Sequence, residues 1–408
     1  MTAAIDTGRR RRPVRAATAV TVTAVALSVL PFSLVGASAV QIRDDLGLDD
    51  LALGTAMGSF YVVAVLASAL MGRLAGRAGA VSGLRLGVLL GIASLTGIAL
   101  LARGWVALAG FLAVGGLALA VLQPSADLWV TRNVPRRRHG LTYGFKQSAA
   151  PIATFTAGLA LPLVALPFGW RWSYAAAAVV AVGVLVLLPR GSASGGGRGD
   201  DRTGDAQVRT LVLIAVAYAL GNVGAVGLGG FFVSHAVRAG VPEGTAGVLF
   251  AASSLGVIVT RIIAGHLSDR FRSDSFLPIA GFLLAGAGAC LLLAHSGRAG
   301  VYVFGPLAMV TAWGWLGLLA LAVVRANPGA PAAATGITQT GGYIGAGTGP
   351  LVFGFLAHSV SYQAAWAAVA VAMCLAAGCM LGAQRQLRRD TGVAANVAAG
   401  VVAGAGRR

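Results

Sequence analysis

The feature of this sequence that most limits its fold is a series of long apolar runs that recurs from one end of the chain to the other. Each run is long enough to cross the roughly 30 Å hydrocarbon core of a bilayer as a helix. The chain is 57% hydrophobic and 11% charged, with a mean hydropathy of +0.80. Soluble globular domains carry about twice that share of charge. The sequence therefore predicts an all-α integral membrane protein.

The apolar runs predict twelve transmembrane helices, six on each side of a polar segment rich in Gly and Ser. The expected spans are 16–40, 51–71, 83–101, 105–130, 140–167, a sixth ending near 188, 210–234, 247–264, 275–293, 301–324, 334–357 and 363–381. The expected domains are a basic tail 1–15, a six-helix bundle 16–188, a linker 189–209, a second bundle 210–383 and a loosely ordered tail 384–408.

The charge distribution predicts the orientation in the membrane. The chain holds 31 Lys+Arg against 13 Asp+Glu, a formal net charge of +18. Lys146 lies in a span, and the basic residues on one side of the expected spans are only Arg43, Arg103, Arg171, Arg238 and Arg298. Nearly all the others lie in or beside the tails and the opposite turns, so we expect a multi-pass protein of the cell membrane with both termini in the cytoplasm. Because topology explains the excess charge and no nucleic-acid module accompanies it, we expect no nucleic-acid partner.

The two halves match each other in sequence. The turn after the second span, Gly72-Arg-Leu-Ala-Gly-Arg77, resembles the turn after the eighth, Gly265-His-Leu-Ser-Asp-Arg270. Likewise Lys146-Gln147 in the fifth span corresponds to Thr338-Gln339 in the eleventh. Repeated bundles around a central site are the architecture of secondary transporters, which work by rocking one half against the other.

These turns resemble the signature of the major facilitator superfamily between its second and third spans, Gly-x-x-x-Asp-Arg-x-Gly-Arg. The first copy here keeps Gly72, Arg77 and Gly79 but has Gly76 at the acidic position, whereas the second copy keeps the acidic residue. The resemblance implies two pseudo-symmetric six-helix bundles that move as a rocker switch. It also implies gating roles for Gly72, Arg77, Arg261, Gly265, Asp269 and Arg270.

Two features of that superfamily are missing. Gly110 stands where an arginine of the fourth span is expected, and the fifth span does not match the antiporter signature Gly-x-x-x-Gly-Pro-x-x-Gly-Gly. Both departures argue against standard drug/proton exchange. The segments that include Gln123-Pro124, 144–147, Pro151 and 169–172 more closely resemble the cyanate-permease-type branch.

The one acidic residue inside an expected span is Asp127, and it should pair with Lys146. Asp127 lies shortly before the turn between the fourth and fifth spans, and Lys146 lies a similar distance after it. In an antiparallel hairpin both reach the same depth, where pairing offsets the cost of burying the charges. The pair has three readings: a structural ion pair, a cavity site in which Lys146 meets a polar or anionic solute, or a proton-coupling site at Asp127.

Further polar residues lie in the spans, and nothing in the sequence assigns them a structural role. Those we take as candidates to line a solute cavity with Lys146 and Asp127 are Gln147, Asn222, Gln339 and Tyr343. The alternative is that such groups join helices by hydrogen bonds. Glycines near Gly341 and Gly349 predict close packing of the eleventh span against a neighbouring helix.

The sequence therefore favours a secondary active transporter for a small organic or anionic solute, driven by the proton gradient and working as a monomer. Export of a drug or metabolite by the same architecture is the alternative. The only lysine lies in a span, so no Gly-x-x-x-x-Gly-Lys-Ser/Thr motor is present. A membrane enzyme would need clustered His, Asp or Glu at one face, so we expect no enzyme, no metal and no cofactor. A sensor that binds without transporting stays open.

Overall fold

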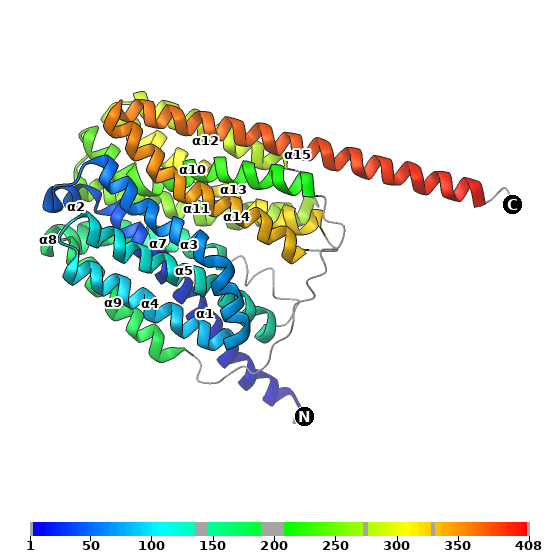
Figure 1. The fold of residues 1–408 in the computed structure, drawn as a ribbon, viewed down its shortest axis with the longest axis horizontal. Coiled ribbons are helices and arrows are strands. Elements are labelled where there is room, and N and C mark those ends of the chain that lie inside the picture. Colours follow the sequence, from blue (N-terminus) through cyan, green and yellow to red (C-terminus); the bar gives the residue numbers. More distant parts are fainter. Residues whose placement is uncertain (1–2, 135–145, 189–207, 272–275, 328–330, 406–408) are drawn as a thin grey trace.

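Every regular element of the structure is helical (Figure 1). The computed structural model describes residues 3–134, 146–188, 208–271, 276–327 and 331–405. The first half contains α1 (Ala3–Ala37), α2 (Ala39–Leu46), α3 (Asp50–Ala78), α4 (Ala80–Leu101), α5 (Trp105–Asn133), α7 (Ala149–Ala160), the π-helical turn η2 (Leu161–Ala165), α8 (Leu166–Phe168) and α9 (Trp170–Leu187). The second half contains α10 (Val208–Arg238), α11 (Glu243–Phe271), α12 (Leu277–His295), α13 (Arg298–Ala326), α14 (Pro331–Ser359) and α15 (Tyr362–Ala405).

The packing within the first half is repeated in the second. In the first half α3 packs on α5, and α4 packs on both α5 and α9. In the second half α11 packs on α13, and α12 packs on both α13 and α15, which are the helices six spans further along. The predicted duplication is therefore present in the contacts as well as in the sequence, and the fold is two six-helix bundles related by pseudo-symmetry.

Eleven described helices are long and apolar enough to cross a membrane. The predicted span missing from that set, 334–357, lies within the 29-residue helix α14. Its hydropathy is lowered by Thr338, Gln339 and a glycine stripe, and this composition fits its place at the centre of the bundle. A Cβ at Gly341 would lie 2.1 Å from the carbonyl oxygen of Ala215 on α10, so the predicted close packing is confirmed. With α14 the fold has twelve transmembrane helices.

Several predicted boundaries were wrong. Residues 72–78 form the last turns of α3 rather than a loop, and Gly79 alone, with φ of +89°, separates α3 from α4. Residues 265–270 likewise belong to α11. The glycines in these two segments suggested turns, but both helices continue beyond their apolar stretch.

Both expected tails contain helix. The expected basic tail 1–15 is helical from Ala3, and the tail expected to be loosely ordered continues α15 to Ala405. Figure 1 shows α15 running well beyond the bundle. Ala and Val dominate this last segment, and Ala is the residue that favours helix most. Most of the predicted linker 189–209 and the Arg-rich turn at 135–139 lie outside the described residues.

The described part of the fifth span is irregular at two points. Lys146 and Gln147 are helical, Ser148 forms a turn, and α7 begins at Ala149. Further along, η2 contains Pro162, whose missing N–H interrupts the α-helical ladder. The expected start of this span, residues 140–145, lies outside the described residues, so its length before Lys146 stays a prediction.

Both termini lie at the same end of the bundle, and α2 and α8 lie at the other (Figure 1). We call these the termini end and the α2 end. The two halves meet chiefly through α3 with α14, α7 with α11, and α1 with α10. Glycines bring these backbones together: a Cβ at Gly36 would lie 2.1 Å from the Gly229 carbonyl oxygen, and one at Gly54 would lie 2.4 Å from that of Pro350. Since Gly36 ends α1 and Gly54 begins α3, the halves are joined at the α2 end.

Candidate functional site

A cavity of about 100 Å³ lies between the two halves, and we call it the central cavity. The first half lines it with Val29, Tyr61, Leu119, Gln123, Gln147 and Ala150. The second half lines it with Tyr218, Asn222, Val226, Arg261, Trp313, Leu316, Gln339, Gly342, Tyr343 and Ala346. The wall is amphipathic, with aliphatic and aromatic surface interrupted by amides, phenols and one guanidinium.

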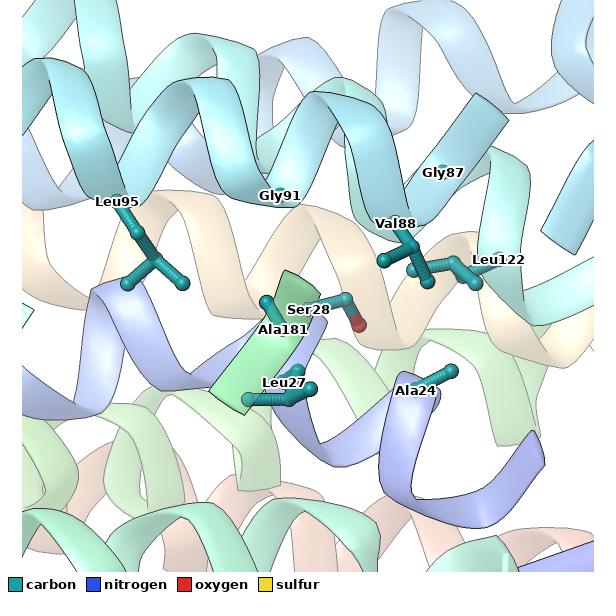
Figure 2. Close-up of a pocket in the computed structure, with 9 residues that line it drawn as sticks. All are labelled: Ala24, Leu27, Ser28, Gly87, Val88, Gly91, Leu95, Leu122 and Ala181. Carbon is teal, nitrogen blue, oxygen red and sulfur yellow. The ribbon is translucent and has the colours of Figure 1, made fainter. Parts of the chain in front are cut away.

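A second hollow lies within the first half, among α1, α4, α5 and α9 (Figure 2). Its volume is about 0 Å³, so it does not hold even a water molecule. The polar side chain among its lining residues is Ser28, whose hydroxyl donates to the carbonyl of Val25 at 2.7 Å. This hollow is a gap in apolar packing and offers no binding chemistry.

Four of the expected cavity residues line the central cavity: Gln147, Asn222, Gln339 and Tyr343. Asn222 also joins two helices, because its Nδ2 donates to the carbonyl oxygen of Gly342 at 2.7 Å. That amide nitrogen therefore ties α10 to α14. Gln339 lines the same cavity as the phenols of Tyr218 and Tyr343.

Lys146 and Asp127 form the ion pair that their depths in the hairpin predict. Lys146 Nζ donates to Asp127 Oδ1 at 2.6 Å and approaches the carbonyl oxygen of Gln123 at 3.4 Å. The lysine side chain is 8% exposed and the aspartate 41%. Neither residue lines the central cavity. Gln123 and Gln147, which lie close to the pair in the sequence, do line it. The pair thus lies directly behind the wall of the first half.

Arg261 was expected in a gate, and the structure places it in the wall of the central cavity. Its Nε and Nη2 donate to the carbonyl oxygen of Trp313 at 3.2 and 3.0 Å. Its Nη1 donates to the carbonyl oxygen of Gln147 at 2.5 Å. The first two bonds hold the guanidinium against α13 in its own half, and the third reaches the other half.

The remaining expected gating residues lie at the termini end. Gly72 and Arg77 belong to the last turns of α3, where Arg77 is exposed. Gly265, Asp269 and Arg270 belong to the last turns of α11, and their side chains lie outside what the structure describes. Gating by these five residues stays a prediction. Among the described residues, no group of three or more His, Cys, Asp or Glu could hold a metal ion.

A polar cluster at the α2 end was not predicted from the sequence. Asp50 is 7% exposed at the start of α3. Its Oδ1 accepts hydrogen bonds from Arg43 and, at 2.8 Å, from the hydroxyl of Tyr362. Its Oδ2 accepts one from Arg238 at 2.7 Å. Arg238 also covers the ring of Tyr362, with 4.4 Å from Cζ to the centroid.

This cluster connects the halves, because Arg43 and Asp50 belong to the first while Arg238 and Tyr362 belong to the second. Nearby, the amide of Gln41 approaches the carboxylate of Glu243 across the same boundary at 3.5 Å. Glycine packing and charged contacts therefore act together at the α2 end. A central cavity closed at one end by contacts between two homologous bundles is the arrangement of a membrane transporter.

The comparisons with known proteins agree with this class. The sequence profile described as Major Facilitator Superfamily matches residues 21–330 and, in a second match, 210–399. Together these matches cover most of the chain, including both halves. The chain belongs to the major facilitator superfamily.

A solved structure and a curated relative are similar to this chain. The crystal structure of a bacterial homolog to the human lysosomal transporter Spinster, in an inward-facing and occupied conformation, matches with a TM-score of 0.73 and 16% identity, covering 90% of this chain and 96% of that one. At that identity the match concerns the fold. An Arabidopsis thaliana protein described as "Putative glycerol-3-phosphate transporter 1" is 32% identical over 152 residues. The match spans 34% of this chain and 28% of that protein.

Proposed function

We propose that this chain is a secondary active transporter that carries a small organic or anionic solute across the cell membrane by rocker-switch alternating access. The observation that carries the proposal is the position of the central cavity, which both halves line. The halves meet at the α2 end, so a rocking motion that parts them there and joins them at the termini end exposes the cavity to the other side. The protein works as a monomer, since each chain contains a complete cavity.

We place the termini end in the cytoplasm and the α2 end outside the cell. The support is the positive-inside pattern, since basic side chains at the termini end include Arg73 and Arg77 on α3 and Arg385 on α15. The arrangement described is then closed to the outside. The Asp50 cluster and the glycine contacts are the outer seal in this orientation.

The solute in this proposal is small and polar, because the cavity of about 100 Å³ has room for several water molecules at roughly 10–15 Å³ each and its wall carries amides, phenols and a guanidinium. The name of the Arabidopsis relative gives that protein an organic phosphate as cargo, which supports an anionic solute here. Export of an aromatic drug or metabolite is the second candidate, and the observation that favours it is the aromatic lining from Tyr61, Tyr218 and Trp313.

The proton gradient is the proposed driving force, with Asp127 as the coupling group. Its carboxylate is 41% exposed, and it is the counter-charge of Lys146. Protonation of Asp127 leaves the buried lysine without its partner, which is strongly unfavourable. Gln123 and Gln147 line the cavity beside this ion pair, so in this proposal they link proton binding at Asp127 to the conformation of the cavity wall.

The experiment that tests the function is uptake and efflux of a panel of small solutes in proteoliposomes that carry the purified protein, with and without an imposed pH gradient. The proposal expects flux of at least one organic anion that exceeds protein-free vesicles and responds to the gradient. Binding of a solute at equilibrium with no flux in either direction contradicts transport and favours a sensor.

A further inference from the structure

Arg261 is a charged side chain near the end of the candidate span Glu243–Ala264, in the wall of the central cavity, with no carboxylate partner among the described residues. Its printed hydrogen bonds all go to backbone carbonyl oxygens, those of Trp313 and Gln147. Tyr218, which lines the same cavity, is neutral under ordinary conditions and supplies no counter-charge. An arginine guanidinium keeps its proton in proteins, so the cavity wall carries a fixed positive charge.

The hydrogen-bonding capacity of Arg261 is only partly used. A guanidinium has five N–H donors, and the bonds to Trp313 and Gln147 use three of them. One N–H on each terminal nitrogen is left for a molecule in the cavity. The bonds to the backbone fix the plane of the guanidinium fork, whose two unused donors can bind the oxygens of a carboxylate or a phosphate.

The surrounding wall supplies further donors but no competing acid. The phenols of Tyr61, Tyr218 and Tyr343 line the same cavity, and so does Gln339. None of the lining residues is Asp or Glu. Asp127, the acid of the neighbouring hairpin, already pairs with Lys146, so that pair adds little net charge.

The sign of the uncompensated charge selects the ligand. A cationic solute in the central cavity would meet Arg261 with no carboxylate to stabilise it, which is unfavourable at low dielectric. An anion supplies the missing counter-charge and accepts from the free donors of the fork. The Lys146–Asp127 ion pair behind the wall does not attract an anion in the same way, because Asp127 neutralises Lys146 within the first half.

We propose that Arg261 binds the oxyanion of a small organic acid in the central cavity, with the phenols of Tyr218 and Tyr343 as additional donors. This inference rests on the proposed transport function and narrows its solute to anions. A carboxylate and a phosphate ester share the required chemistry. Since Arg261 also donates to Gln147, the bound oxyanion lies beside a contact between the two halves, where its presence affects both.

The test uses two anions and their neutral counterparts: lactate with lactamide, and glycerol 3-phosphate with glycerol. Ligand-induced thermal stabilisation of the purified protein measures binding, and proteoliposome counterflow measures transport. We expect at least one anion to stabilise and to exchange, and its neutral counterpart to do neither. Whether lactate or glycerol 3-phosphate acts tells a carboxylate site from a phosphate site.

Three variants assign the effect to Arg261. Arg261→Gln should weaken the active anion at least tenfold, and Arg261→Lys should lie in between, since it keeps the charge but loses the fork. Arg103→Gln, which removes an exposed charge at the α4–α5 turn, is the matched control and should bind like the unmodified chain. If Arg261→Gln does not fold, an unchanged affinity in Arg261→Lys overturns the proposal of a bidentate site.

The outcomes separate this inference from the transport proposal. Anion exchange that survives Arg261→Gln, or exchange of lactamide or glycerol in place of the anions, overturns the role of Arg261 and leaves transport intact. Failure of all four solutes to bind and to exchange counts against both proposals.

Discussion

The glycine contacts at the α2 end predict how a single methyl group should move the equilibrium between closed and open arrangements. Gly36 on α1 faces α10 across the boundary between the halves. A Cβ there would lie 2.1 Å from the carbonyl oxygen of Gly229 and 3.1 Å from Cα of Gly230. Ordinary carbon–oxygen contacts are about 3.3–3.6 Å. In Gly36→Ala the two helices must therefore separate by about 1 Å at this point.

The cost of that separation falls on the contact between the halves rather than on either bundle. Overpacking of a close contact costs about 1–3 kcal/mol. If all of it weakens the closed arrangement, the ratio of closed to open molecules falls about 5- to 150-fold. The fold of each half is unaffected, so the variant should be produced and inserted normally.

The assay is the labelling of a cavity cysteine from outside intact cells by a membrane-impermeant maleimide. Ala346→Cys places the thiol in the cavity wall, in a chain whose native Cys290, Cys374 and Cys379 are replaced by Ala. Gly36→Ala should raise the labelling rate several-fold or more. If the rate is unchanged in a stable variant, the α1–α10 contact does not help to close the α2 end.

Two glycines of the first half provide matched controls. A Cβ at Gly110 meets nothing within 4 Å, so Gly110→Ala should change neither labelling nor stability. A Cβ at Gly116 would lie 2.0 Å from the carbonyl oxygen of Phe60 in the same half. Gly116→Ala should lower thermal stability without raising the outside labelling. Equal labelling in Gly116→Ala and Gly36→Ala would show that general loosening, not the boundary between halves, governs access.

Two further predictions concern the charged contacts. Asp50→Asn removes the shared counter-charge of Arg43 and Arg238 and should cost about 2 kcal/mol, less than a fully buried pair because Arg238 is half exposed; we expect a lower melting temperature and faster outside labelling, and no change in either contradicts the seal. Lys146→Gln alone leaves Asp127 unpaired and should reduce abundance, measured by fluorescence size-exclusion, whereas adding Asp127→Asn should restore it. Full recovery of flux in the double variant means that the pair is structural, and recovery of abundance without flux places it in the transport cycle.

The sequence predicts the features of this protein that depend on neighbouring residues or on regular repetition. Twelve spans follow from apolar runs, and the pairing of Lys146 with Asp127 follows from their equal depths in one hairpin. The resemblance to the major facilitator superfamily predicts the division into two bundles, which the profile match supports. The likeness to the cyanate-permease-type branch stays a prediction.

Contacts between distant segments could not be predicted in the same way. Asp50 meets Arg238 from 188 residues away and Tyr362 from 312 residues away, and nothing near Asp50 in the sequence marks it as different from its acidic neighbours. Arg261 was assigned to a gate because it precedes the second signature turn. Its distance from that turn along α11 instead places it at the cavity, where only the packing of α13 reveals its role. Tyr61 and Tyr218 were missed because aromatic residues in a span look like ordinary packing.

The most direct test of the central claim is whether transport requires the two halves to part at the α2 end. Gln41 and Glu243 face each other there across the boundary, with 3.5 Å between Nε2 and Oε2. In the chain without native cysteines, Gln41→Cys with Glu243→Cys can be joined by a reversible bifunctional methanethiosulfonate. We predict that cross-linking abolishes solute flux in proteoliposomes, that reduction restores it, and that neither single variant responds to the reagent. Undiminished flux through the cross-linked protein would contradict alternating access about the central cavity.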